Sequence, residues 1–169
     1  MLGTGAFGKV FQTFNKHDDS FKVAIKVLDK HKLAEGLDCI IEEIAILHTL
    51  DHPSIVKYFE TYDDNKFIYL VMEYIEGQQL FDKISQKKNQ LFTEQEAAHY
   101  MRELFSALNH CHAQGIIHRD IKPENIMVTE SGSVRLIDFG LSKASGKKQL
   151  HTIAGTPYYM APEVIDGNY

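Results

Sequence analysis

Three polar residues in the segment 117–125 have the types and the spacing to act on one reacting group. Asp120 is followed by Lys122 two positions later and by Asn125 five positions later. An aspartate can accept or orient the proton of an attacking hydroxyl, and a lysine can offset developing negative charge. An amide oxygen can bind a hard metal ion. Together these side chains can surround a phosphoryl group during its transfer.

A second carboxylate, Asp138, stands after the apolar pair Leu136-Ile137 and before Phe139-Gly140. It can reach the same metal ion as Asn125 if the chain folds back on itself between them. Any one of these residues can also be an ordinary hydrogen-bonded loop residue. The complete ordered set has no comparable structural explanation, so it predicts a site.

The first ten residues contain the glycine-rich string Gly3-Thr4-Gly5-Ala6-Phe7-Gly8-Lys9-Val10. Glycines allow the backbone to approach phosphate oxygens closely and to direct amide groups at them. Dinucleotide-binding folds use nearly the same spacing, but there a helix follows the last glycine. A β-prone run follows Gly8 here, which disfavours a dinucleotide-binding oxidoreductase. A glycine-rich hairpin turn is the structural alternative.

Lys26 lies at the end of Val23-Ala24-Ile25-Lys26, where a small alanine leaves room for a flat ligand beside the lysine. A solvated surface lysine is the commoner situation. Glu43 lies on the apolar stripe of the helix that residues 35–50 predict. Leaving one half of a buried ion pair unmatched costs roughly 3–5 kcal/mol, so Glu43 needs a cation, and Lys26 is the expected partner. A solvated acidic helix face is the alternative for Glu43.

Around these residues the sequence predicts a β-rich first part and a helical second part. Thr93-Glu94-Gln95-Glu96 is typical of a capping box that begins a helix, and Gly115 is a natural end for it. Gly77 marks a boundary between the two parts. The predicted strands are residues 10–14, 21–28, 55–59 and 66–73, followed by a hairpin of residues 126–129 and 134–137.

Composition excludes several classes of protein. The chain has 169 residues, is 44% hydrophobic and carries a formal net charge of −5. It is too apolar for a disordered segment, and its charge favours neither nucleic acid nor an anionic membrane as the main partner. We see no signal peptide and no apolar run of about 20 residues that could span a membrane. Two cysteines predict a reducing, cytoplasmic setting.

Taken together, the motifs resemble the eukaryotic protein kinases over the whole chain. Lys122 and the string Gly155-Thr156-Pro157-Tyr158-Tyr159-Met160-Ala161-Pro162-Glu163 resemble the serine/threonine kinases. Further strings resemble the calcium/calmodulin-dependent and calcium-dependent kinases: Leu50-Asp51-His52-Pro53, Phe81-Asp82-Lys83-Ile84 and Asp138-Phe139-Gly140-Leu141-Ser142-Lys143. The resemblance implies an α+β, two-lobe fold truncated at both ends, with a small lobe at 1–75 and an incomplete large lobe at 76–169.

The resemblance also implies the roles of individual residues, with ATP and Mg²⁺ as cofactors. Asp120, Lys122, Lys26 and Glu43 would be catalytic, and Asn125 and Asp138 would hold Mg²⁺. Thr152 would be a phosphorylation site read by Arg119 and Lys143, and Thr156 would contact Asp120 and Lys122. Leu47, Tyr58, His118 and Phe139 would stack as a regulatory spine. The nucleotide would contact Leu2, Gly3, Thr4, Gly5, Ala6, Phe7, Gly8, Lys9, Val10, Ala24, Lys26, Met72, Glu73, Ile75, Gln79 and Met127.

The implied function is ATP-dependent phosphorylation of serine and threonine hydroxyls on protein substrates. A calcium sensor, either calmodulin or fused EF-hands, would lie outside this chain, since no calcium-binding loop occurs in it. Gln79 stands where related kinases have glutamate, which weakens the attraction for basic substrates. An apolar helix face at 97–111 is expected to be exposed, and we expect the isolated polypeptide to be poorly stable and weakly active. The alternative function is a catalytically silent nucleotide-binding or interaction fragment.

Overall fold

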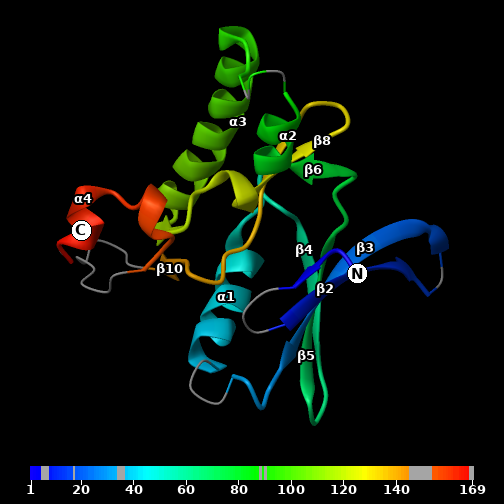
Figure 1. Ribbon diagram of the computed structural model, residues 1–169. Coiled ribbons are helices and arrows are strands. Elements are labelled where there is room, and N and C mark those ends of the chain that lie inside the picture. Colours follow the sequence, from blue (N-terminus) through cyan, green and yellow to red (C-terminus); the bar gives the residue numbers. More distant parts are fainter. Residues whose placement is uncertain are drawn as a thin grey trace.

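The structure is a computed structural model that describes residues 1–4, 8–16, 18–33, 37–87, 89, 91–144 and 154–167 (Figure 1). It is an α+β fold, as the sequence predicts. The strands are β1 (Gly3–Thr4), β2 (Gly8–Asn15), β3 (Asp18–Asp29), β4 (Tyr58–Asp63), β5 (Phe67–Glu73), β6 (Gly77–Gln79), β7 (Ile116–Ile117), β8 (Ile126–Thr129), β9 (Val134–Leu136) and β10 (Lys143–Ala144). The α-helices are α1 (Leu37–Thr49), α2 (Leu80–Gln86), α3 (Glu94–Ala113) and α4 (Pro162–Ile165), and two short 3-10 helices span Pro123–Asn125 and Pro157–Tyr159.

The first part of the chain forms an antiparallel sheet with the strand order β1-β2-β3-β5-β4. Alternation along β3 places Lys26 and Leu28 on one face. Leu28 is completely buried and belongs to the same core cluster as Ile40 and Leu47 of α1. Lys26 therefore lies on the face of the sheet that α1 covers.

One predicted strand begins later than the sequence indicates. Residues 55–59 were expected to be extended as one strand, but β4 begins at Tyr58. The backbone before it bonds to β9 instead: the amide of Val56 donates to Leu136 (2.9 Å), and the amide of Leu136 donates to Ser54 (2.8 Å). These bonds connect the segment that follows α1 to the hairpin of the second part.

Helix α3 has the predicted ends, but the apolar face at 97–111, which was expected to be exposed, is exposed only in part. The Thr93 hydroxyl accepts from the amide of Glu96, whose carboxylate in turn accepts from the amide of Thr93, and Gly115 follows the helix with φ +70°. Met101 and Phe105 are 41% and 59% exposed. Within the same range Tyr100, Leu104, Ala107 and Cys111 are buried.

Two small sheets hold the loops that carry the candidate chemistry. The strands β7 and β10 pair with each other, and β6, β8 and β9 form the second sheet. Strand β7 ends directly before His118, and β8 begins directly after Asn125. Strand β9 ends two residues before Asp138. The short strands therefore fix both ends of the Asp120 loop and bring Asp138 beside it.

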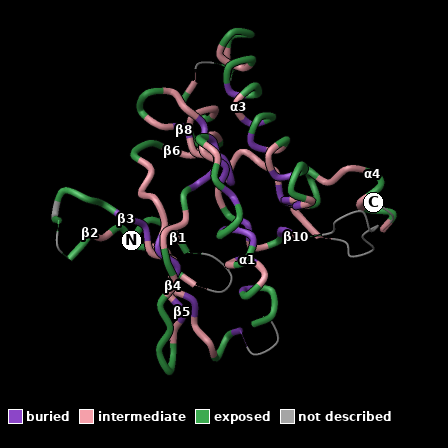
Figure 2. Tube along the Cα trace, turned by 180° about the vertical axis from the view of Figure 1, so that it is seen from behind, coloured by how far each residue is buried: buried purple, intermediate pink, exposed green. Residues whose placement is uncertain are grey.

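Buried residues gather in the middle of the molecule, whereas the free ends of the β2–β3 and β4–β5 hairpins are exposed (Figure 2). Across the described ranges, no helix combines the length and the apolar character that a membrane span requires.

Candidate active site

Lys26 forms the predicted ion pair with Glu43. Its Nζ lies 2.6 Å from Glu43 Oε1 and 3.4 Å from Asp138 Oδ1. The Glu43 side chain is only 2% exposed, and that of Lys26 is 20% exposed. Desolvation lowers the pKa of Lys26, but the charges of Glu43 and Asp138 outweigh it, so the net pKa is raised and the ammonium is retained. One cation thus joins β3, α1 and the Asp138 loop.

The backbone around Asp138 is unusual and holds its carboxylate toward Lys26. Asp138 has φ +60°, a left-handed conformation that non-glycine residues seldom adopt. Gly140 packs so closely that a Cβ there would lie 3.2 Å from Asp138 Oδ1. Between them, Phe139 is buried, with its ring centroid 4.8 Å from that of His118. Such strain persists only where surrounding contacts impose it, and it is common at functional sites.

Asp120 is surrounded by three hydrogen-bond donors. The Thr156 hydroxyl donates to Oδ1 (2.6 Å), and Lys122 Nζ and Asn125 Nδ2 lie 2.7 and 2.8 Å from Oδ2. Lys122 also donates to the Thr156 hydroxyl (2.8 Å), which completes a closed network. Burial raises the pKa of Asp120, but the bonds from Lys122 and Thr156 outweigh it, so the net pKa is lowered. Asp120 is therefore an ionised acceptor at neutral pH.

His118 connects the Asp120 loop to the Asp138 loop. Its Nδ1 accepts from the amide of Asp120 (3.3 Å), so Nε2 carries the hydrogen and donates to the carbonyl of Ile137 (3.2 Å). Burial lowers the pKa of His118, so the ring is neutral. The histidine therefore acts as a fixed hydrogen-bonded bridge between the two loops.

Asn125 and Asp138 have suitable donor atoms for a magnesium ion. The Asn125 amide nitrogen donates to the backbone and side-chain oxygens of Asp120, which leaves its amide oxygen as the atom for a cation. The Asp138 carboxylate is half exposed. Both ligand atoms are hard oxygens, and Mg²⁺ binds through one or two such protein groups together with phosphate oxygens and water. The residues present therefore fit the ion.

Some of the predicted nucleotide-contacting residues lie on strands beside Lys26, and Gln79 and Met127 pair with each other in the separate β6-β8-β9 sheet. In the sheet register, Val10 of β2 is opposite Lys26 and Met72 of β5 is opposite Ala24, while Met127 of β8 is opposite Gln79 of β6. The remaining predicted residues fall into two groups. Leu2, Gly3, Thr4, Gly8, Lys9, Glu73 and Ile75 are described, whereas Gly5, Ala6 and Phe7 lie outside the described residues.

The side chain of Glu73 has a role that sequence reasoning missed. Its carboxylate accepts from Arg135 Nε of β9 (3.2 Å) and from the amide of Lys57 (3.1 Å). Only the backbone of Glu73 is therefore left to meet a nucleotide. Nothing in the sequence around Glu73 indicates that its side chain pairs with Arg135, 62 residues later.

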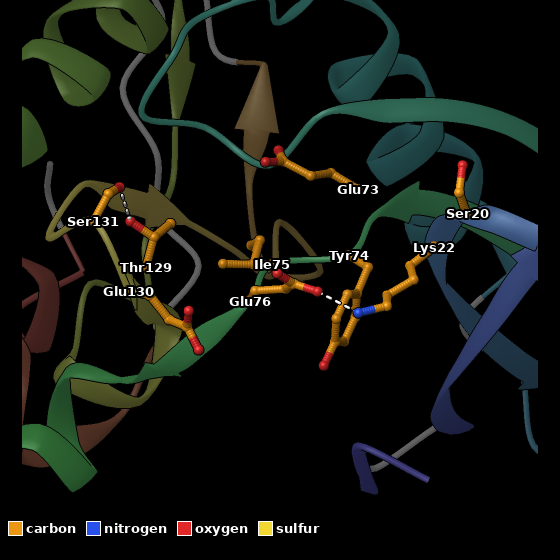
Figure 3. Close-up of a pocket in the computed structure, with 9 residues that line it drawn as sticks. All are labelled: Ser20, Lys22, Glu73, Tyr74, Ile75, Glu76, Thr129, Glu130 and Ser131. Carbon is orange, nitrogen blue, oxygen red and sulfur yellow. Dashed lines mark hydrogen bonds and ion pairs between the residues drawn. The ribbon is translucent and has the colours of Figure 1, made fainter.

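A depression beside Glu73 does not include the candidate catalytic groups. It has a volume of about 410 Å³ and is lined by Glu73 and the three residues after it, by two residues of β3 and by the β8–β9 turn (Figure 3). Lys22 forms an ion pair with Glu76 across it. Lys26, Asp120 and Asp138 do not line it. It shares Glu73 and Ile75 with the predicted nucleotide-contacting residues but contains none of the three charged groups named above.

The three predicted regulatory residues are only partly described. Arg119 has φ +68° and donates from Nε to the carbonyl of Leu141 (2.6 Å). Lys143 Nζ lies 2.6 Å from Glu42 Oε2, a partner that sequence reasoning missed. Thr152 lies outside the described residues.

The string His110-Cys111-His112 has separate environments for its side chains. His110 is hydrogen bonded to Gln114 (2.9 Å), Cys111 is buried in the core, and His112 is exposed. Burial raises the pKa of Cys111 to about 11, so its sulfur stays protonated at neutral pH.

A comparison with protein families matches residues 1–169 to the protein kinase domain. The chain belongs to the protein kinase family. The motifs that carry the resemblance in the sequence are brought together in the structure: the Lys26–Glu43 pair, the Asp120 loop and the Asp138 loop.

Several curated kinases are similar to this chain over nearly all of its length. Calcium-dependent protein kinase 5 of Plasmodium falciparum is 42% identical over 99% of this chain and 30% of its own length. Calcium/calmodulin-dependent protein kinase type 1 of Caenorhabditis elegans is 42% identical over 98% of this chain and 48% of its own. CBL-interacting serine/threonine-protein kinase 20 of Arabidopsis thaliana is 44% identical over 98% and 38%. This kinase chain thus spans less than half of each relative.

Proposed function

We propose that this protein transfers the γ-phosphoryl group of ATP to serine or threonine hydroxyls of protein substrates. The observation that carries the proposal is the convergence of Lys26, Asp138 and Asp120 through the bridges at Glu43 and His118. The Lys26 ammonium, the carboxylates of Asp120 and Asp138 and the amide oxygen of Asn125 are then the groups available to a bound phosphate and its metal ion. The Arabidopsis thaliana relative is named a serine/threonine-protein kinase, which supports the class of substrate.

In this proposal each residue has a distinct task. Lys26, kept charged by Glu43, binds the α- and β-phosphates. Asp120 orients the attacking hydroxyl and takes its proton while the bond from that oxygen to the γ-phosphorus forms and the bond to the β-phosphate oxygen breaks. Lys122 offsets the negative charge of the transferring group. Most of the rate enhancement then comes from positioning and electrostatic stabilisation.

We propose Asn125 and Asp138 as the protein ligands of Mg²⁺, which when bound neutralises phosphate charge. The adenosine would contact the strands around Ala24, Met72 and Met127, with the backbone at Glu73–Ile75 beside the base. The glycine-rich residues 3–8 would cover the phosphates. The full set proposed to contact nucleotide is that given in the sequence analysis, with the Gly5, Ala6 and Phe7 contacts resting on the motif alone.

Regulation is proposed on the same basis. Phosphorylation of Thr152 would add a charge of about −2 and form hydrogen bonds with Arg119 and Lys143. Since Lys143 is paired with Glu42 in the structure, the phosphate would compete for that cation. The names of two relatives, calcium-dependent and calcium/calmodulin-dependent, support a calcium sensor as a partner outside this chain.

The proposal is tested by incubating the chain with radiolabelled ATP, Mg²⁺ and a mixture of serine- and threonine-containing peptides. Asp120→Asn keeps the shape of the side chain and should lower the rate by about 10²–10⁴-fold, the contribution of a positioned base. Asp82→Asn, on the exposed side of α2, is the matched control. Transfer that survives Asp120→Asn would contradict the mechanism. Nucleotide binding without transfer by the unaltered chain would favour the silent fragment instead.

A further inference from the structure

Glu42 makes two contacts with the strand that follows the Asp138 loop. Its Oε2 lies 2.6 Å from Nζ of Lys143, and its Oε1 accepts from the amide of Ala144 (3.3 Å). The two residues form β10, more than 100 positions later in the chain. Both carboxylate oxygens are thus used on one short strand.

These contacts are partly shielded from solvent. The side chain of Glu42 is 27% exposed and that of Lys143 is 43% exposed. A carboxylate that accepts both an ammonium and a backbone amide is held in one orientation, unlike a single exposed ion pair. Because Glu42 also accepts from a backbone amide, its contacts depend on the position of β10 and not only on the charge of Lys143.

The position of β10 matters because it pairs with β7. Lys143 is opposite Ile117 and Ala144 is opposite Ile116, and β7 runs directly into His118 and the Asp120 loop. The segment from Asp138 to β10 is short. A helix that holds β10 therefore holds the ends of both catalytic loops.

Glu42 also stands directly before Glu43 on α1. Adjacent residues of a helix point in different directions, so α1 makes two separate attachments. Glu43 pairs with Lys26, which itself lies 3.4 Å from Asp138, and Glu42 reaches β10. The two attachments fix both the distance and the rotation of α1 relative to the Asp138 loop.

We propose that Glu42 is a positioning residue for the phosphoryl transfer. It docks α1 onto β10 so that Glu43, Lys26 and Asp138 stay in contact while the nucleotide binds. This inference rests on the proposed function, because it assigns Glu42 a task in that reaction. It does not require phosphorylation of any residue.

The test compares variants of the full chain in two measurements. The first is site-resolved hydrogen exchange of the Ala144 amide, which does not depend on catalysis. The second is the Michaelis constant for ATP at fixed Mg²⁺. Glu42→Gln keeps an acceptor for the Ala144 amide, Glu42→Ala removes both contacts, and Lys143→Ala removes the cation. Asp38→Asn, which removes one negative charge from the exposed start of the same helix, is the matched control.

We expect Glu42→Ala to speed exchange at Ala144 and to raise the Michaelis constant for ATP about fivefold, with a smaller effect for Glu42→Gln and none for Asp38→Asn. Once Glu42 is alanine, the further change Lys143→Ala should have little additional effect. A merely structural role would reduce the folded fraction and leave the Michaelis constant unchanged.

Each other result overturns the inference. Unchanged exchange at Ala144 in Glu42→Ala would show that the contact is not made. Faster exchange with an unchanged Michaelis constant would show a contact without a positioning role. A parent chain that neither binds ATP nor transfers phosphate would refute the proposed function, and the positioning role with it, and the parent measurement alone identifies that case.

Discussion

Replacing Glu43 by glutamine removes the charge that faces Lys26 while keeping the shape of the side chain. The Glu43 carboxylate is almost completely buried, and its Oε1 lies 2.6 Å from the ammonium. Its Oε2 is buried without a hydrogen-bond partner among the described residues. The variant would therefore leave a largely buried cation with only Asp138, 3.4 Å away and half exposed, as its counter-charge.

The size of the effect follows from this geometry. Removing one member of a buried ion pair costs about 3–5 kcal/mol, and the remaining contact with Asp138 places the expectation at the lower end, about 3 kcal/mol. For a chain of this size that corresponds to a fall in melting temperature of roughly 10 °C. Replacing both residues with apolar ones, as in Lys26→Met with Glu43→Leu, should cost much less, because no unpaired charge remains.

The assay is urea unfolding followed by circular dichroism, with the midpoint and slope compared between variants. Glu76→Gln is the matched control, because it removes a carboxylate from the exposed pair with Lys22, and its midpoint should equal that of the parent. Equal midpoints for Glu43→Gln and the parent would refute the reasoning. A double variant as unstable as the single one would refute it as well.

Further outcomes follow from the other groups of the site and the core. Burial lowers the pKa of both His52 and His118 from the usual value of 6.5. The contribution of these histidines to stability should therefore be constant above pH 6.5 and fall below it, because the unfolded chain then binds protons that the folded chain does not. Urea midpoints between pH 5 and 8 measure this dependence, and a flat profile would contradict it. Thr156→Val removes a hydrogen-bond donor to Asp120, the proposed base, and should lower kcat/KM for peptide phosphorylation roughly tenfold, whereas an unchanged value would mean that the hydroxyl does not act on Asp120. A thiol reagent should modify the exposed Cys39 in the native protein and reach Cys111, whose pKa is about 11, only after unfolding, so two fast-reacting thiols would argue against the buried position.

Much of the site could be predicted because its signals are local or demand a partner. The Thr93 capping box is read within four residues, and it is present. Glu43 lies on an apolar stripe, where an acid needs a cation, and the nearest suitable lysine on the sheet is the one it meets. The family resemblance then related the Thr156 hydroxyl to Asp120, and the bond is present at 2.6 Å.

The features that sequence reasoning missed depend on contacts between distant segments. The strand expected to begin at Ile55 begins at Tyr58, because the backbone before it bonds to Leu136 of β9. Local β-propensity contains no information on that competition. Nothing near Glu42 in the sequence indicates that Lys143 and its strand return to α1.

We propose that Lys26, Asp120, Asn125 and Asp138 act together on one magnesium-bound triphosphate. The most direct test of this proposal is the dissociation constant of ATP, measured by calorimetry with and without Mg²⁺, for the parent chain and for Asp138→Asn. Mg²⁺ should tighten ATP binding to the parent, and Asp138→Asn should lose most of this gain. Binding that is equally strong without Mg²⁺, or a magnesium effect that Asp138→Asn leaves intact, would contradict it.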